Sequence, residues 1–313
     1  METIGNIHVV QNRYSLDKAG EKRQRLHRQR YAELRDSRYG SRVSREDRFI
    51  LTCPRPEDTI KQIDKRFKEG DVLALFTGDG GFHDVVNGIH LFASQPGLKK
   101  ARLLVLDGGF ANDGALQLNS RRALSRPSTI LDRGKTIDFS PQAWRFDTDA
   151  GSEVRLANLY GTIGRSALVA AAVSKARNRA EAGDSWLKKF LITRQAAQEA
   201  APFKLETPGR EGPHETYDFG MANGSRMAGF GGAFPVRLEE SDSYHFELNS
   251  PGYLVSGVKL AAGMIKGERV SAPYTLRLPY GGAVQLDGEA AVFADETAIT
   301  ISRSREEFTV FSS

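Results

Sequence analysis

Carboxylates placed beside glycines are the residues of this chain best suited to chemistry. Asp79 stands between Gly78 and Gly80 in the run Thr77–Gly81. Glycines let a backbone approach a ligand closely, and the N–H groups at a helix start bind phosphate. A carboxylate in such a turn can orient a hydroxyl and accept its proton. Taken alone, the run is equally well explained as a glycine turn with an aspartate helix cap.

The elements that position Asp79 are a buried strand and an amphipathic helix. Residues 72–76 form a short apolar run, and apolar side chains recur at helical spacing from Phe82 to Phe92. The order strand, glycine turn, helix places Asp79 at the carboxyl end of a strand. Open α/β sheets bind their ligands at that edge.

A second turn of glycines and carboxylates follows the apolar run at residues 102–106. It contains Gly108 and Gly109, and it ends in Asn112 and Asp113 before another helical segment. Each of the last two residues could also be an ordinary helix N-cap. Because both turns follow strands of one parallel sheet, we expect them to share a crevice.

A third motif, Asp287-Gly288-Glu289, lies near the other end of the chain. Segments of alternating hydrophobicity surround it, and Asp-Gly between two such segments predicts a two-residue β-hairpin turn.

Length and composition favour a soluble protein with two domains. The chain has 313 residues, of which 40% are hydrophobic and 27% charged. The lone Cys53 cannot form an internal disulfide, which fits a reducing compartment. No apolar run is long enough to span a bilayer, and no signal peptide is visible. We therefore expect a cytoplasmic protein.

The net charge of +5 is concentrated in one segment. Residues 17–48 hold 11 Lys/Arg against 6 Asp/Glu, and the rest of the chain is balanced. A solvated helix stabilised by i,i+4 pairs is the usual outcome for such a run. A surface for anionic lipid and a nucleic-acid site are the alternatives, and we expect no stable nucleic-acid partner.

The periodicity of the chain changes near Arg126-Pro127. Before it, strands and helices alternate four times, which predicts an α/β domain with a parallel sheet flanked by helices. After it, a strand at residues 155–160, a glycine turn at 161–164 and an alanine-rich helix to about residue 179 are expected. Alternating segments then run to Phe308 and Val310 and predict a β-sandwich-like domain. We expect the domains to cover residues 1–125 and 126–313.

The three motifs, in this order, resemble signatures of the diacylglycerol and sphingosine lipid kinase family. Residues 77–89, T-G-D-G-G-F-H-D-V-V-N-G-I, are similar to its G-G-D-G-x-x-x-E-V-x-N-G-L signature. Residues 112–115 resemble its Asn-Asp-x-Ala motif, and residues 285–289, Q-L-D-G-E, its Q-x-D-G-E motif. The chain departs from the family pattern at Thr77, Gly81, Asp84 and the Asp107-Gly-Gly-Phe loop.

The resemblance implies a diacylglycerol kinase-like catalytic domain with the fold that NAD kinases share. It also implies transfer of the γ-phosphate of ATP, with Mg²⁺, to a lipid hydroxyl of the diacylglycerol or sphingoid type. Asp79 would orient and deprotonate that hydroxyl, supported by Asp113 and Glu289, while Asp287 would bind the metal and its turn would face the interdomain cleft. The nucleotide contacts implied are Asn12, Thr52, Thr77, Gly78, Gly80, Gly81, Gly108, Gly109, Asn112, Asp287 and Glu289.

Two alternatives to a lipid kinase stay open. One is an NAD kinase, which shares the glycine turn but needs no membrane surface. The other is a non-catalytic relative that binds nucleotide or lipid, which the departures at Thr77 and Gly81 would suit. For a lipid kinase we expect a lipid substrate at a membrane surface and peripheral association with that membrane. A homodimer is possible, and the sequence does not decide the oligomeric state.

Overall fold

The computed structural model describes residues 4–11, 21–46, 48–51, 56–108, 112–178, 186–227, 234–249, 266–271 and 273–313. The chain divides into two compact units, which are treated separately below. Unit 1 comprises residues 1–140 and 306–313, and unit 2 comprises residues 141–305. Unit 1 is therefore longer than the expected domain 1–125, and it takes up a segment from beyond unit 2.

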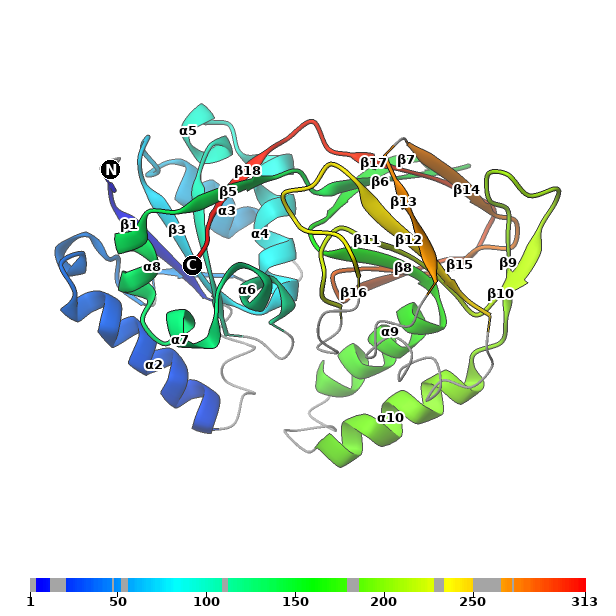
Figure 1. Cartoon of the computed structure of the whole chain (residues 1–313), viewed down its shortest axis with the longest axis horizontal. Coiled ribbons are helices and arrows are strands. Elements are labelled where there is room, and N and C mark those ends of the chain that lie inside the picture. The colour runs from blue at the N-terminus through cyan, green and yellow to red at the C-terminus, as the bar shows by residue number, and fades with distance from the viewer. Residues whose placement is uncertain are drawn as a thin grey trace. The chain divides into compact units, whose positions relative to one another are not determined.

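Unit 1 is built on a six-stranded sheet with the order β2-β1-β3-β4-β18-β5 (Figure 1). The strands are β1 (Ile7–Gln11), β2 (Phe49–Ile50), β3 (Val72–Thr77), β4 (Arg102–Asp107), β5 (Thr136–Phe139) and β18 (Phe308–Phe311). All neighbours pair in parallel except β5, which is antiparallel to β18. Every residue of β1 and β3 is buried, as expected for parallel strands covered on both faces.

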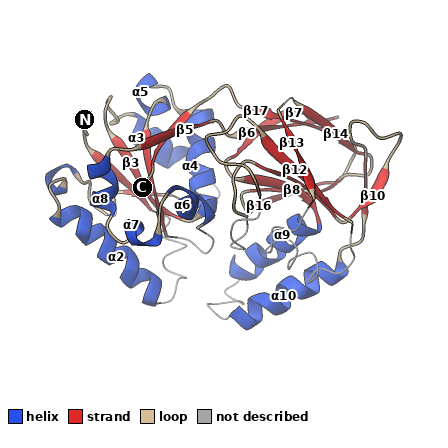
Figure 2. Ribbon diagram, viewed as in Figure 1, coloured by secondary structure: helices blue, strands red, loops and turns tan. Residues whose placement is uncertain are grey.

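Helices flank the strands of unit 1 (Figure 2). They are α2 (Glu21–Asp36), the 3-10 turn η1 (Gly40–Arg42), α3 (Glu57–Asp64), α4 (Asp79–Phe92), α5 (Pro96–Lys99), α6 (Asp113–Leu118), α7 (Arg121–Leu124) and α8 (Pro127–Arg133). The α/β prediction for this half of the chain is confirmed. Helix α4 turns Phe82, Val85 and Ile89 toward the core, which is the apolar spacing read from the sequence.

Strand β18 corrects one sequence expectation. The alternation around Phe308 and Val310 predicted a strand of the second domain. The strand instead inserts between β4 and β5 in unit 1. Phe139 and Phe308 pack ring to ring at 5.9 Å across that pairing. Alternation identifies a strand with one buried face but not the sheet that the strand joins.

Unit 2 contains two main antiparallel sheets, with the orders β13-β12-β11-β8-β15-β16 and β14-β17-β6-β7. The strands are β6 (Gln142–Thr148), β7 (Gly151–Ala157), β8 (Tyr160–Gly164), β9 (Phe203–Leu205), β10 (His214–Thr216), β11 (Asp218–Ala222), β12 (Ser243–Leu248), β13 (Gly267–Val270), β14 (Tyr274–Leu278), β15 (Gly282–Leu286), β16 (Glu289–Phe293) and β17 (Thr297–Arg303). Helices α9 (Arg165–Asn178) and α10 (Trp186–Glu199) pack against each other, and α9 also packs on β15 and β16.

The core of unit 2 lies between its two main sheets. Trp144 and Ile299 of one sheet are buried with Phe219 and Leu286 of the other, so the β-sandwich prediction is confirmed. The glycine turn expected at residues 161–164 is instead strand β8. A Cβ at Gly161 would come within 2.8 Å of the Trp144 ring, so this glycine makes room for a large core side chain.

No helix in the described part of the chain has the length and apolar character that crossing a membrane would require.

Candidate functional site

Asp79 begins helix α4 directly after strand β3. The preceding Gly78 is extended (φ −94°, ψ −166°) and offers no side chain to cap the helix. Gly78 therefore cannot supply the side-chain acceptor that commonly caps a first turn, and a helix start preceded by glycine is typical of anion-binding sites. Asp79 itself is only 5% exposed.

The Asp79 carboxylate joins the two sequence motifs of unit 1. Its Oδ2 accepts a hydrogen bond from the Asp113 N–H at 3.0 Å, and its Oδ1 accepts one from the Gly114 N–H at 2.9 Å. Asp113 is fully buried at the first position of α6. The carboxylate thus serves as the acceptor for the start of α6, which fixes the second turn against the first.

Strand pairing brings the same two turns together from the other side. Thr77 lies opposite Asp107 in the β3–β4 register, and the Gly108 N–H donates to the Thr77 carbonyl at 2.9 Å. A Cβ at Gly108 would lie 2.8 Å from the Phe76 carbonyl carbon. Gly108 is therefore required by the close approach of two backbones. The two turns therefore lie at the same edge of the sheet of unit 1, as expected.

Thr77 and Gly81 occupy one small space. A Cβ at Gly81 would come within 2.8 Å of the Thr77 Cγ2 and 2.9 Å of its Oγ1. Thr77 is 1% exposed, and its hydroxyl has no hydrogen-bond partner among the described residues. The two departures from the family signature are therefore coupled, because the threonine occupies the space that a side chain at position 81 would need.

An ion pair that the sequence did not suggest lies at the end of β4. Arg30 of α2 is buried, and its Nη1 and Nη2 lie 2.6 and 2.8 Å from Asp107 Oδ1 and Oδ2. Nη1 also donates to the Asp107 carbonyl at 2.5 Å. Burial raises the pKa of Asp107 above its ordinary value, against the opposing charges of Arg30 and Arg121. Arg30 is thus a structural ion-pair partner and not part of a solvated basic face.

His27 lies one helical turn before Arg30. It is 3% exposed, and its ring packs edge-on against Phe76 at 4.7 Å. Burial, together with the positive charge of Arg30, lowers the pKa of His27 from 6.5 to about 4. The neutral ring lies with Nδ1 3.0 Å from a Glu46 carboxylate oxygen, so Nδ1–H is the donor to that acid.

The third motif forms the predicted hairpin turn in unit 2. Leu286 pairs with Glu289, and Asp287 (φ 51°) and Gly288 (φ 96°) are the two left-handed residues between them. Both oxygens of the buried Asp287 carboxylate accept N–H bonds. The donors are Asn158, Leu159 and Tyr160, at 2.6, 2.8 and 3.0 Å. Asp287 therefore holds the β7–β8 turn.

These bonds bear on the expected metal site. A carboxylate that already accepts three N–H donors has little capacity left for a cation. Among the described residues no group of three or more His, Cys, Asp or Glu side chains is arranged to hold a metal ion. Asp287 does not fit the role of a direct Mg²⁺ ligand in this arrangement. Glu289 is exposed at the start of β16.

The structure brings together most of the predicted site residues of unit 1. Those at the paired ends of β3 and β4 are Thr77, Gly78, Asp79, Gly80, Gly81, Gly108, Asn112 and Asp113. Asn12, Thr52 and Gly109 lie outside the described residues. Asp287 and Glu289 lie in unit 2. Sequence reasoning missed the roles of Arg30 and His27, because the burial of these two positions in a basic helix is known only from the fold.

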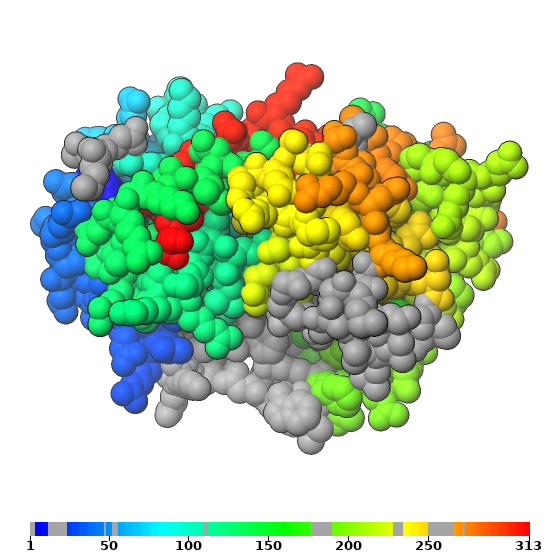
Figure 3. Space-filling model, viewed as in Figure 1, coloured from blue at the N-terminus to red at the C-terminus, as the bar shows by residue number. Residues whose placement is uncertain are grey.

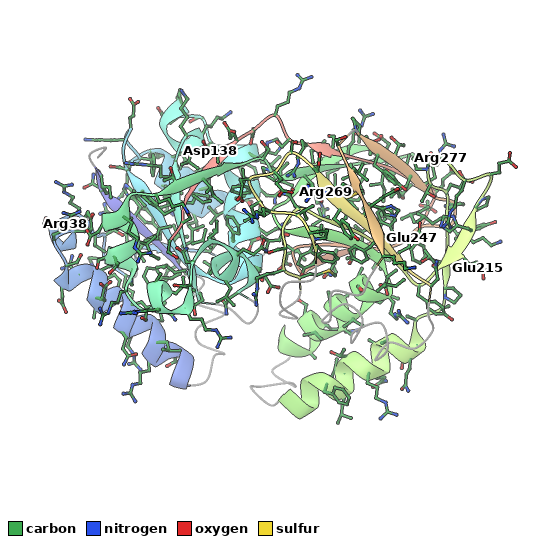
Figure 4. The ribbon with its side chains drawn as sticks, in the orientation of Figure 1. Arg38, Asp138, Glu215, Glu247, Arg269 and Arg277 are labelled. Atoms are coloured by element: carbon green, nitrogen blue, oxygen red, sulfur yellow. The ribbon has the colours of Figure 1, made fainter. Side chains whose placement is uncertain are left out.

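A cluster of titratable side chains surrounds Glu247 in unit 2, and Figure 4 labels this glutamate. His214 of β10 lies 3.1 Å from Glu247 of β12, and His245 and Arg210 lie 3.6 Å from the same carboxylate. Burial alone would raise the pKa of Glu247. The His245 hydrogen bond and the charges of His214 and Arg210 outweigh burial and hold it below its ordinary value.

Comparison with known proteins agrees with this architecture. No family profile matches the sequence, and no curated protein is similar to it in sequence. A proposed diacylglycerol kinase from Bacillus anthracis str. Sterne is similar in structure, with a TM-score of 0.66, 14% identity and coverage of 100% of this chain and 99% of that one.

Two further solved structures share the fold. A diacylglycerol kinase from Bacillus anthracis str. Sterne gives a TM-score of 0.58 at 13% identity, covering 100% of this chain and 98% of that one. Yeast NADH kinase complexed with NADH gives a TM-score of 0.54 at 11% identity, covering 100% of this chain and 84% of that one. This chain has the fold common to diacylglycerol kinases and NADH kinase, as the sequence resemblance implied.

Proposed function

We propose that this chain is a kinase that transfers the γ-phosphoryl group of ATP to the hydroxyl of a lipid of the diacylglycerol or sphingoid type. The observation that carries the proposal is the Asp79 carboxylate, which two N–H bonds hold at the start of α4. One rigid carboxylate beside an uncapped helix start offers a hydroxyl-orienting group and phosphate donors within a single turn.

The chemistry of Asp79 follows from its fixed position. The acceptor oxygen forms a bond to the γ-phosphorus as the bond from that phosphorus to the bridging oxygen of ADP breaks. The hydroxyl proton passes to Asp79 late in this step, because an aspartate is a weak base toward an alcohol. The N–H groups at Gly80 and Gly81 are suited to the negative charge of the phosphates. Asp113 supports Asp79 through its own N–H.

Magnesium is proposed to enter with ATP. Mg²⁺ is usually held by one or two carboxylates together with phosphates and water, so a three-acid cage is not needed. When bound, it would offset the negative charge of the phosphates. Glu289 is exposed and could supply one ligand, whereas Asp287 is engaged by three N–H groups.

Helices α9 and α10 of unit 2 favour a lipid acceptor over a soluble dinucleotide. Leu168, Phe190 and Leu191 leave 37–51% of their surface exposed on this helix pair. Val292 of β16, the strand against which α9 packs, is 71% exposed. Exposed apolar side chains on elements that pack together are suited to an acyl or sphingoid chain.

The test is phosphate transfer from radiolabelled ATP to diacylglycerol, sphingosine, ceramide, monoacylglycerol and NAD, using the wild-type chain and Asp79→Asn. We expect labelled organic-phase product, reduced at least about 100-fold in the variant. The asparagine amide cannot accept both N–H bonds, so the variant should also lose about 1–3 kcal/mol of stability. Thermal unfolding must therefore confirm that the variant is folded at the assay temperature.

Asp58→Asn is the matched control, since Asp58 is an exposed aspartate at the start of α3 in the same unit. It should leave transfer unchanged. Full activity in folded Asp79→Asn would remove the proposed role of Asp79. Label on NAD alone would assign the chain to the NAD kinases. ATP binding without transfer to any acceptor would assign it to a non-catalytic relative.

A further inference from the structure

Five exposed arginines lie on helices α2 and α7 of unit 1 and at the N-cap position of α8. Helix α2 contributes Arg25 and Arg28, and α7 together with the residue before α8 contributes Arg121, Arg122 and Arg126. We name these five the arginine surface. No acidic side chain of the described residues forms an ion pair with any of them. Within the described side chains, which do not include Glu21, no ion pair offsets their positive charge.

The two helices are close in space although they lie about ninety residues apart. Arg30 on the inner face of α2 binds Asp107, and Arg121 of α7 acts on the charge of the same carboxylate. Glu33 of α2 accepts hydrogen bonds from the Ser128 N–H, at 3.0 Å, and from its hydroxyl, which ties α2 to α8. In Figure 3, the blue surface of α2 and the green surface of α7 and α8 adjoin on one face of unit 1.

The acids near this surface are already engaged. Glu33 accepts both Ser128 donors, Asp107 is held by Arg30, and Asp132 of α8 pairs with Arg38 at 2.8 Å. Among residues 24–36 of α2, whose exposure the structure describes, Asp36 is the one exposed acid, and it lies at the end of the helix opposite to Arg25. Leu26, 38% exposed, is an apolar side chain among the arginines.

The position of the arginine surface indicates what kind of partner it binds. Asp107 ends strand β4 and lies opposite Thr77, and it pairs with Arg30 on the inner face of α2, so the helix that carries Arg25 and Arg28 packs at the carboxyl edge of the sheet where the candidate site lies. A lipid acceptor resides in a bilayer, so the enzyme must present this edge to the bilayer. Arginine pairs well with phosphate, and clustered basic residues bind anionic membranes.

We propose that the arginine surface docks unit 1 on a bilayer containing anionic phospholipid headgroups. The choice of a membrane as the partner rests on the proposed function, because only a lipid acceptor requires the sheet edge that holds the candidate site to face a bilayer. The arginine surface shares only Arg25 and Arg28 with the basic segment 17–48 that the sequence offered for anionic lipid. Arg30 does not take part, because Asp107 occupies its guanidinium, and α7 contributes arginines that no charge run in the sequence marked.

The experiment is co-sedimentation of the full chain with vesicles of phosphatidylcholine mixed with phosphatidylglycerol, in the absence of ATP. The two test variants are Arg25→Gln/Arg28→Gln and Arg121→Gln/Arg122→Gln. Each arginine near an anionic surface contributes about fivefold to partitioning, so each double variant should bind about 30-fold more weakly. Raising the salt concentration should weaken wild-type binding, because exposed charges are screened.

Lys99→Gln/Lys100→Gln is the matched control. It removes the same charge from two exposed lysines at the end of α5, which lies at the other end of unit 1 in Figure 1. Its binding should stay within about twofold of wild type. An equal loss in the control would show that net charge alone drives binding and would overturn the proposal.

Further outcomes separate this proposal from the proposed kinase activity. Transfer to a short-chain, water-soluble acceptor should survive in the arginine variants, because the arginines do not touch the reacting groups. Arginine-dependent vesicle binding without any transfer would support the surface and remove the kinase. Unchanged vesicle binding in both arginine variants would overturn the surface, whatever the transfer assay gives. Tighter arginine-dependent binding to a duplex oligonucleotide than to vesicles would also overturn it.

Discussion

Thr77 and Gly81 are a coupled pair at the residue scale. A side chain at position 81 would overlap the Thr77 methyl and hydroxyl, so Gly81→Ala should lower the free energy of unfolding by about 1–3 kcal/mol. Removing the threonine side chain makes the space available again. Thr77→Gly/Gly81→Ala should therefore show a favourable coupling of about 0.5–3 kcal/mol in a double-mutant cycle by chemical denaturation.

Gly97→Ala is the control for this cycle. A Cβ there would meet its nearest neighbour, the Glu69 backbone nitrogen, at 3.6 Å, which is an ordinary contact. The control should be nearly neutral. If Gly81→Ala is also neutral, the two positions are independent and the signature departures need separate explanations.

His27 predicts how stability depends on pH. Its pKa is about 4 in the folded chain and 6.5 when unfolded, so the unfolded state binds the extra proton between these values. The contribution of neutral His27 is complete above pH 6.5 and is lost as the pH falls toward 4. The loss totals about 3 kcal/mol.

The measurement is urea unfolding of wild type and His27→Gln across this pH range. The difference between the two free energies of unfolding should change with pH in the stated direction, because glutamine does not titrate. A constant difference would mean that Glu46, 3.0 Å from the ring, keeps His27 protonated in the fold.

Single residues also mark the limits of sequence reading. The Asp287-Gly288 turn was predictable, since its type I′ signature is local. The three N–H groups that donate to Asp287 belong to residues 158–160, and no sequence pattern around Asp287 predicts these distant partners. In the same way, the charge run correctly located a basic helix, but Asp107 lies 77 residues from Arg30, and only the fold brings them together.

At the scale of elements, helix α9 is anchored by a buried ion pair. Arg165 and Asp218 are 0% and 1% exposed, with Nε and Nη2 of the arginine 3.1 Å from Oδ2. Burial raises the pKa of Asp218 above its ordinary value, against the opposing charge of Arg165. The other oxygen accepts the Ser166 N–H at 2.5 Å, so Asp218 also caps the helix start.

Arg165→Met should therefore be costly. It leaves an uncompensated carboxylate in the core of unit 2, and we expect a loss of about 3–5 kcal/mol in the free energy of unfolding. Arg145→Met is the comparison, because Arg145 pairs with Asp147 at 2.9 Å on the exposed surface of the same unit. It should cost less than about 1 kcal/mol. Equal costs would show that burial of the first pair contributes nothing.

The elements were predicted best where one local pattern fixed them. Strands β1, β3 and β4 appear within about a residue of their expected bounds, since each is a continuous apolar run. Helix α4 ends at the expected Phe92 but begins at Asp79, three residues before the apolar stripe, because the glycine turn forms its first turn. Strand β8 was missed because its two glycines indicated a turn. Gly161 faces Trp144, and a Cβ at Gly164 would meet the Phe203 ring, so both are small for reasons of packing.

The whole molecule depends on β18 to complete unit 1. Phe308, Val310 and Phe311 are buried in the sheet between β4 and β5, so Val310→Lys should unfold unit 1 by placing a charge in its core. Thr309→Lys is the control. Thr309 points the other way, and its hydroxyl bonds the exposed Asp138, so a lysine there meets a carboxylate.

Limited proteolysis with mass spectrometry distinguishes the two variants. In Val310→Lys the new cleavage sites should fall within residues 1–140, while unit 2 stays protected. Thr309→Lys should match wild type. Protection of residues 1–140 in Val310→Lys would mean that the sheet tolerates the loss of this strand, and that β18 is an addition to unit 1 rather than part of its core.

The same strand sets an order of events during protein synthesis. A ribosome makes residues 1–140, then all of unit 2, and only afterwards the strand that fits between β4 and β5. Unit 2 can fold as soon as it emerges, whereas β4 and β5 must wait with open edges that can pair with other chains. In the nascent protein, residues 1–140 should therefore need chaperone protection for longer than unit 2 does. Slow translation of unit 2 should lower the yield of soluble protein.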